Sequence, residues 1–172
     1  MSETPERQIG QYLSFELDGE EYGIDISRIR EVLDYTRPTV VPRMPAFVRG
    51  IINLRGSVVP VVDLRSRFGM GQTGRTADTR IIIGEVEVDG VKAVLGTLAD
   101  AVHEVMEMDS ASIEPPPGIG TGLEAGFITG IGKRDRGFLM ILDLDRVFSA
   151  GELARAGIGV GRVPEGAALA QE

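Results

Sequence analysis

The chain has 172 residues, a length that allows one domain or two small ones and excludes a large multidomain enzyme. It contains no Cys and a single His, His103, which excludes disulfide frameworks and thiolate metal sites and makes a reducing cytoplasm the expected compartment. Eighteen basic and 26 acidic side chains give a net charge of −8, which argues against nucleic acid as a partner. Without a run of about 18 apolar residues, no direct membrane insertion is expected.

The first predicted element is a β-hairpin that follows a polar arm, residues 1–10, expected to be flexible. Residues 12–17 alternate between apolar and polar, Asp18-Gly19 supplies a tight turn, and residues 21–26 return as the second strand. Throughout the chain, Gly and Pro divide the apolar runs into pieces of strand length. The sequence therefore predicts a mostly β fold.

A second hairpin of the same kind is predicted in the other half of the chain. Residues 80–88 form its first strand, Asp89-Gly90 its turn and residues 91–98 its second strand. The polar, Gly-rich segment 69–78 is the expected connector between the halves. Residues 149–172 are expected to begin as a short helix and to continue as a tail.

The densest pattern lies between these hairpins, in residues 45–68. Gly56 permits a sharp turn after a strand, and Arg55 stands at that turn. We expect its guanidinium to meet the carboxylate of Glu31, which belongs to a strand over residues 29–33. Pro60 interrupts the next strand and predicts an edge or a bulge there. Such an ion pair at a rim is usually solvated and adds little to stability, so its alternative use is to order a binding surface.

The two halves of the chain resemble each other. Residues 29–33 repeat the pattern of residues 102–106, and a constant offset of 80 relates a longer block. The matched pairs are Phe47/Phe127, Val48/Ile128, Gly50/Gly130, Ile51/Ile131, Asp63/Asp143, Leu64/Leu144 and Phe68/Phe148. The repeat predicts two five-stranded β units, about residues 11–70 and 79–148, each curled into a barrel. Which unit receives the terminal strands stays open, because duplicated halves can exchange them.

Asp63 and Asp143 occupy matching places and allow two interpretations. In the first, each carboxylate ends a strand and caps the short helix that follows. In the second, the two carboxylates approach a shared water and act as an aspartate-dependent hydrolase, which requires them to lie within hydrogen-bonding reach of it. The first interpretation is favoured, so no catalytic residue, metal site or cofactor is expected.

These residues resemble the CheW family of bacterial chemotaxis coupling proteins. The resemblance is carried by the segments EEYGIDI (20–26), PAF (45–47), NLRG (53–56) and PVVDLR (60–65), and it extends from about residue 11 to 148. It implies two SH3-like five-stranded β-barrels with short connecting helices and no enzymatic activity. It further implies an adaptor that links the cytoplasmic hairpin of a chemoreceptor to the regulatory domain of the histidine kinase CheA, in the cytoplasm at membrane-associated receptor arrays.

The resemblance also implies binding residues. Those expected to engage the receptor in a groove between the barrels are Ile29, Glu31, Val32, Gly50, Arg55, Gly56 and Val105. The kinase is expected to contact mainly the second barrel, with Ile119 as a further contact. Apolar side chains such as Ile29, Val32 and Val105 suit a helix that docks into a groove. One alternative within the same fold is an adaptor of a non-chemotactic chemosensory array.

Overall fold

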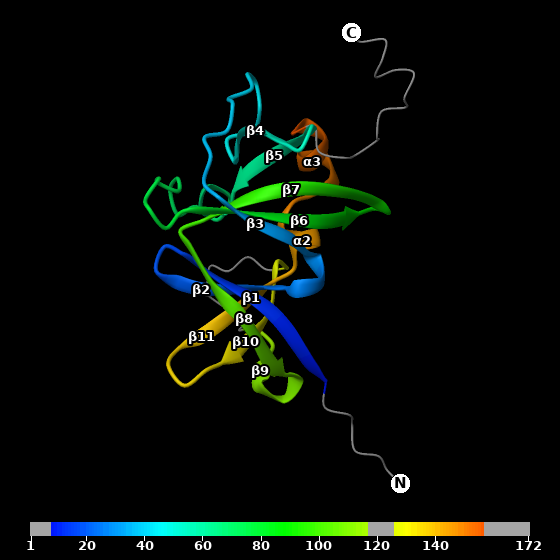
Figure 1. The fold of residues 1–172 in the computed structure, drawn as a ribbon. Helices are drawn as coiled ribbons and strands as arrows, with labels where there is room; N and C mark the ends of the chain where they lie inside the picture. Colours follow the sequence, from blue (N-terminus) through cyan, green and yellow to red (C-terminus); the bar gives the residue numbers. More distant parts are fainter. Residues whose placement is uncertain (1–7, 117–125, 157–172) are drawn as a thin grey trace.

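The computed structural model describes residues 8–116 and 126–156, which form two curled β-sheets (Figure 1). Sheet A contains, in spatial order, β8 (Ala101–Asp109), β1 (Ile9–Leu17), β2 (Glu20–Asp25), β11 (Phe138–Leu142), β10 (Ile128–Lys133) and β9 (Ile113–Glu114). Sheet B contains β3 (Ile29–Asp34), β6 (Arg80–Val88), β7 (Val91–Ala99), β5 (Ser57–Asp63) and β4 (Val48–Leu54). The predicted mostly β fold is confirmed.

Short helices lie between and after the strands. They are η1 (Ile26–Arg28), α1 (Leu64–Arg67), η2 (Ser110–Ser112), α2 (Leu144–Val147) and α3 (Ala150–Arg155). Ser149 begins α3 with a capping box, in which its side chain accepts the Glu152 N–H and the Glu152 carboxylate accepts the Ser149 N–H. The short helix expected at the start of segment 149–172 is therefore present, and residues 157–172 lie outside the described residues.

Both predicted hairpins are confirmed. Strands β1 and β2 pair antiparallel around Asp18-Gly19, and β6 and β7 pair around Asp89-Gly90. All four turn residues have positive φ angles, which these residue types tolerate. Strand β1 begins at Ile9, opposite Asp109 of β8, so the strand includes the last two residues of the segment expected to be a flexible arm.

The hairpins are exchanged between the halves of the chain. The β1–β2 hairpin lies in sheet A with strands from the second half, and the β6–β7 hairpin lies in sheet B with strands from the first half. Parallel pairings join them, with Tyr22 opposite Met140 and Gly96 opposite Val61. The sheets therefore do not divide the chain at residues 70–79. An alternating pattern specifies a hairpin but not the sheet that receives it, which is why the sequence left this exchange open.

The internal repeat is visible in the hydrogen bonds. The register of β4 and β5 shifts between Val48 and Gly50, and the register of β10 and β11 shifts at the position 80 residues later. The N–H of Asp63 donates to the carbonyl oxygen of Phe47 at 2.7 Å, and the N–H of Asp143 donates to that of Phe127 at 2.9 Å. The two halves thus repeat one local structure.

One hydrophobic core extends across both sheets. Phe47 packs on Phe148 with ring centroids 4.8 Å apart, and Phe127 packs on Phe68 at 4.5 Å. Because Phe47 matches Phe127 and Phe68 matches Phe148 in the repeat, these are two equivalent pairs, each joining one half to the other. Aromatic pairs of this kind stabilise beyond the area they bury. This core joins the two curled sheets, and each sheet also encloses a smaller apolar cluster of its own. Sheet B has the five strands expected for each unit, whereas sheet A has six.

Pro60 lies where β5 has a neighbour on one side only. It faces Ile51 of β4, whereas the pairing of β5 with β7 begins at Val61. The missing N–H of Pro60 is therefore harmless. The predicted edge position applies to the first part of β5, and the rest of the strand is interior to sheet B.

Candidate functional site

Glu31 and Arg55 form an ion pair at the surface of sheet B. Arg55 Nη1 lies 3.4 Å from Glu31 Oε1, and Arg55 Nη2 donates to Glu31 Oε2. Glu31 belongs to β3 and Arg55 to the turn after β4, and these are the two edge strands of the sheet. The expected pairing is confirmed, and it connects the edges that the curled sheet brings together.

The turn that carries Arg55 is a two-residue hairpin between β4 and β5. Arg55 and Gly56 have φ angles of 51° and 90°, the left-handed geometry that such turns require. The N–H of Gly56 donates to Asn53 Oδ1 at 2.7 Å and holds the turn from within. The hydrogen bond with Glu31, and then its charge, raise the pKa of Arg55, so the exposed guanidinium remains charged.

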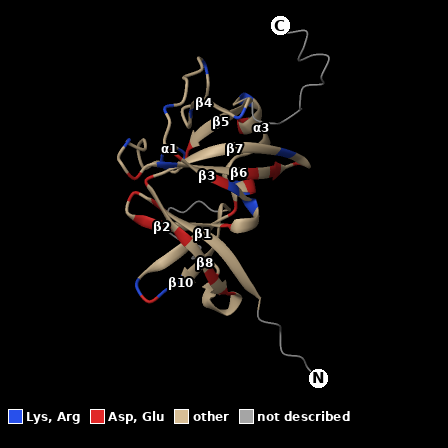
Figure 2. Ribbon diagram, in the orientation of Figure 1, with Lys and Arg blue, Asp and Glu red and all other residues tan. Residues whose placement is uncertain are grey.

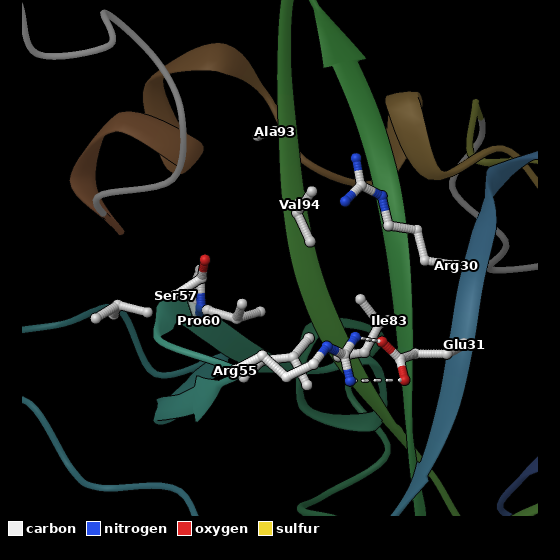
Figure 3. Close-up of a pocket in the computed structure, with 11 residues that line it drawn as sticks. Arg30, Glu31, Arg55, Ser57, Pro60, Ile83, Ala93 and Val94 are labelled. Carbon is white, nitrogen blue, oxygen red and sulfur yellow. Dashed lines mark hydrogen bonds and ion pairs between the residues drawn. The ribbon is translucent and has the colours of Figure 1, made fainter.

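A cleft of about 520 Å³ opens beside this ion pair (Figure 3). Arg30, Glu31 and Arg55 supply its charged lining. The apolar part of the lining comes from Leu54, Val58, Val59, Pro60, Ile83, Ala93 and Val94. A lining that combines charged groups with apolar side chains is suited to a protein side chain or a helix from a partner.

Gly50 has a packing role in the structure. It is buried, its φ angle is 145°, and a Cβ atom there would collide with the carbonyl oxygen of Thr39. Thr39 pairs with Ile51 through two hydrogen bonds of 2.8 and 2.9 Å, so the loop before β4 lies directly against the strand. Gly50 therefore acts on any binding surface through the position of this loop.

The apolar candidates lie on two edge strands. Ile29 is partly buried against the core, whereas Val32 is 38% exposed on β3 and Val105 is 49% exposed on β8. Strands β3 and β8 are edges of different sheets, and the repeat relates Val32 to Val105. Val105 does not line the cleft beside Glu31 and Arg55. The structure thus places Glu31 and Arg55 in the lining of the cleft, Ile29 and Val32 on β3, and Val105 on β8. Gly50 lies in β4 and Gly56 in the turn that follows it.

Charge is unevenly distributed over the two sheets. Figure 2 shows acidic residues along β2 and β8 of sheet A, and basic residues in the loops around β4. His103 lies among the acidic groups, with Nε2 3.5 Å from Glu16 and 4.0 Å from Glu21. Complementary charge at the rim of an interface mainly sets partner choice and association rate.

Asp63 and Asp143 have separate partners. Asp63 is fully buried and accepts hydrogen bonds from Arg49 Nη1 at 2.7 Å and from Thr73 N and Oγ1 at 2.9 and 2.7 Å. It also caps α1, while Asp143 caps α2. The capping interpretation is confirmed. The hydrolase alternative is wrong for this pair, because both oxygens of Asp63 are occupied and no surface of Asp63 reaches water.

Two of the exposed apolar side chains that were not candidate residues match each other in the repeat. They are Val58, 69% exposed near the start of β5, and Phe138, 59% exposed at the start of β11. Their matching positions are the signal that could have identified them. Ile119 lies outside the described residues. Within residues 8–116 and 126–156, no helix is long and apolar enough to span a bilayer.

Comparisons with known proteins agree with this architecture. The model of the CheW-like domain family matches residues 11–152. A probable chemotaxis protein CheW of Rhizobium etli is 34% identical over 142 residues, which are 83% of this chain and 89% of that protein. The chemotaxis protein CheW of Klebsiella aerogenes is 33% identical over 147 residues, 85% of this chain and 86% of that protein.

A solved structure extends the likeness to three dimensions. The crystal structure of the scaffolding protein TtCheW from Thermoanaerobacter tengcongensis superimposes with a TM-score of 0.74 at 41% identity, over 84% of this chain and 96% of that chain. The expected architecture of two SH3-like β units is therefore confirmed. Fold, family match and sequence identity agree over the same residues, and the chain belongs to the CheW-like domain family.

Proposed function

We propose that this protein is a chemotaxis adaptor that couples the cytoplasmic hairpin of a chemoreceptor to the histidine kinase CheA. The observation that carries the proposal is the Glu31–Arg55 pair, set beside a cleft with a mixed charged and apolar lining, on a fold shared with the chemotaxis relatives. The protein is proposed to act by binding its partners, and no chemical step is assigned to it. It acts in the cytoplasm, at arrays of membrane-bound receptors.

The receptor is proposed to contact the edges that carry Ile29, Val32 and Val105, with Glu31 and Arg55 orienting it. A helical partner would cover the exposed apolar side chains, and the ion pair would supply the polar rim. Gly56 contributes by allowing the turn that presents Arg55. Gly50 contributes by holding the loop before β4.

The regulatory domain of the kinase is proposed to bind elsewhere on the molecule, so that receptor and kinase are held together. Phe138 supports this assignment, because its side chain is exposed and phenylalanine is enriched at protein interfaces. Ile119 is the further kinase contact proposed from the family resemblance.

The test is a binding experiment with a purified chemoreceptor hairpin fragment. Arg55→Ala and Glu31→Ala should fold like the parent and bind the fragment more weakly. Lys133→Ala removes a cation of comparable exposure from sheet A and is the control, expected to bind normally. If both site variants bind and support receptor-controlled kinase activity like the parent, the proposed receptor surface is wrong.

A pull-down from the native cell tests the adaptor role itself. A histidine kinase and a coiled-coil receptor should come down together with the protein. The identity of the receptor also separates a chemotaxis array from another chemosensory array. Recovery of neither partner under conditions that preserve other signalling complexes would contradict the proposal.

A further inference from the structure

Among the salt bridges of the described residues, two lie where linkers pass between sheet A and sheet B, and the first is centred on Arg28 of η1. Arg28 Nη1 and Nη2 lie 3.2 and 2.5 Å from the two carboxylate oxygens of Asp145 in α2. Asp145 Oδ1 also accepts the backbone N–H of Glu87 in β6 at 2.7 Å. This cluster, called the Arg28 bridge, joins a linker, a helix and a hairpin strand.

The second salt bridge is centred on Arg65 of α1. Arg65 Nη1 lies 3.1 Å from Asp100 Oδ2, in the single-residue linker between β7 and β8. Asp100 Oδ2 also accepts the backbone N–H of Asp18, in the β1–β2 turn, at 2.7 Å. This cluster, called the Arg65 bridge, again joins a linker, a helix and a hairpin.

The two bridges occupy similar places at the two junctions between the sheets, with their charges reversed. Arg65 and Asp145 are both the second residue of their helices and lie 80 positions apart. Arg28 and Asp100 are both the last linker residue before an edge strand. The helix supplies the cation and the linker the anion in one bridge, and the reverse holds in the other. The two junctions therefore contain the same kind of ion pair with the cation and the anion exchanged.

Each bridge holds the start of an edge strand that carries candidate receptor contacts. Arg28 directly precedes Ile29 in β3, and Asp100 directly precedes β8, which contains Val105. In each bridge the helix follows a strand of the other sheet. Helix α2 follows β11 of sheet A and contacts the linker before β3 of sheet B. Helix α1 follows β5 of sheet B and contacts the linker before β8 of sheet A. Each bridge thus fixes one edge relative to the other sheet.

The side chains of both bridges are partly buried, which favours persistent ion pairs. Side-chain exposure is 35% for Arg28 and 22% for Asp145, and 21% for both Arg65 and Asp100. Ion pairs in this range are screened less by salt than fully exposed pairs. Each carboxylate also receives a backbone N–H, which adds a second and directional contact.

We propose that Arg28, Asp145, Arg65 and Asp100 are positioning residues, which set the orientation of β3 and β8 that the receptor recognises. The inference rests on the proposed receptor-binding function. Neutralising one bridge loosens one edge relative to the other sheet while each sheet keeps its own hydrogen bonds. The free protein then spends part of its time in orientations that do not fit the receptor, which lowers the apparent affinity.

The first experiment measures the orientation of the sheets and needs no partner. The chain has no Cys, so spin labels can be placed at Lys92→Cys in β7 and Glu107→Cys in β8, which are both exposed. Asp145→Asn and Asp100→Asn each remove a charge but keep an oxygen for the backbone N–H. We expect either change to broaden the distribution of label distances. An unchanged distribution in both variants would overturn the inference.

The second experiment measures binding of the same variants to the receptor hairpin fragment. We expect Asp145→Asn and Asp100→Asn to weaken binding about 2- to 30-fold. Lys133→Gln, which breaks a salt bridge inside sheet A, is the matched control and should bind like the parent. If the parent itself does not bind the fragment, the proposed function fails, while the label distances still test the bridges.

A reversal of charge separates positioning from a simple loss of stability. The double variant Arg28→Asp with Asp145→Arg gives the Arg28 bridge the polarity of the Arg65 bridge. We expect it to restore both the label distances and the binding, whereas Asp145→Arg alone should disturb both. Failure of the double variant, in a protein that melts like the parent, would overturn the inference.

Discussion

Glu31 and Arg55 are separated by 24 positions in the chain, and their side chains meet across the two edges of sheet B. An ion pair so exposed contributes little to folding. We therefore expect Glu31→Ala and Arg55→Ala to leave the thermal unfolding midpoint close to that of the parent. The exchanged pair, Glu31→Arg with Arg55→Glu, should also fold normally. Calorimetry on these variants checks this, and a large drop in the midpoint would show that the pair has a structural role.

In contrast to the exposed Glu31–Arg55 pair, the buried carboxylate of Asp63 is expected to contribute strongly to folding stability. Replacing it with Ala leaves the Thr73 donors without a partner and removes the anion that Arg49 contacts. Breaking a buried charged pair on one side costs about 3–5 kcal/mol, and we expect a loss of this size in the free energy of unfolding.

Asp143→Ala is the matched control for this prediction, since Asp143 is the equivalent residue and mainly caps α2. A lost helix cap costs about 1 kcal/mol. Urea denaturation of both variants measures the difference. Equal losses would contradict the separate roles assigned to the two carboxylates.

Gly50 is expected to tolerate no side chain. Gly50→Ala places a Cβ against the carbonyl of Thr39 at a φ angle of 145°, so the strand and the loop before it must separate. Gly137→Ala is the control, because its φ angle is 80° and nothing lies within 4 Å of the added atom. Left-handed strain alone costs about 1–2 kcal/mol, and Gly50→Ala should lose clearly more in urea denaturation.

The raised pKa of Tyr22 predicts that the protein loses stability at alkaline pH. Burial, and then the charges of Glu20 and Asp18, raise the pKa of its phenol above the ordinary 10.0. The folded state therefore holds the proton more tightly than the unfolded state does. This contribution is complete below pH 10.0 and disappears as the pH rises through the folded pKa.

The expected result is a free energy of unfolding that falls more steeply above pH 10.0 in the parent than in Tyr22→Phe. Urea denaturation at a series of alkaline pH values measures both slopes. Because the two proteins differ only at residue 22, the comparison cancels the effect of every other group. Parallel curves would show that the Tyr22 phenol does not contribute.

The hairpins, the repeat and the Glu31–Arg55 pair could all be predicted, because each depends on local patterns or on one charge pair. The Asp-Gly turns specify their hairpins directly. The roles of Asp63 and Asp143 as caps also followed from their places after strands.

The long-range arrangement could not be predicted in the same way. Nothing local distinguishes Tyr22 opposite Met140 from a pairing within its own half. The two salt bridges between the sheets depend on that exchange, since Arg28 meets Asp145 only after β2 joins β11. The burial of Gly50 was likewise invisible, because it arises from the approach of Thr39.

The reciprocal placement of the hairpins has a consequence for the origin of the chain. A polypeptide with only one of the two halves could reproduce these exchanged pairings by lending its hairpin to a second copy and receiving one in return. Such a precursor would have been a homodimer with a twofold axis. Gene fusion would then have locked the two subunits together and freed each to diverge, as the opposite polarities of Arg65 and Asp145 illustrate.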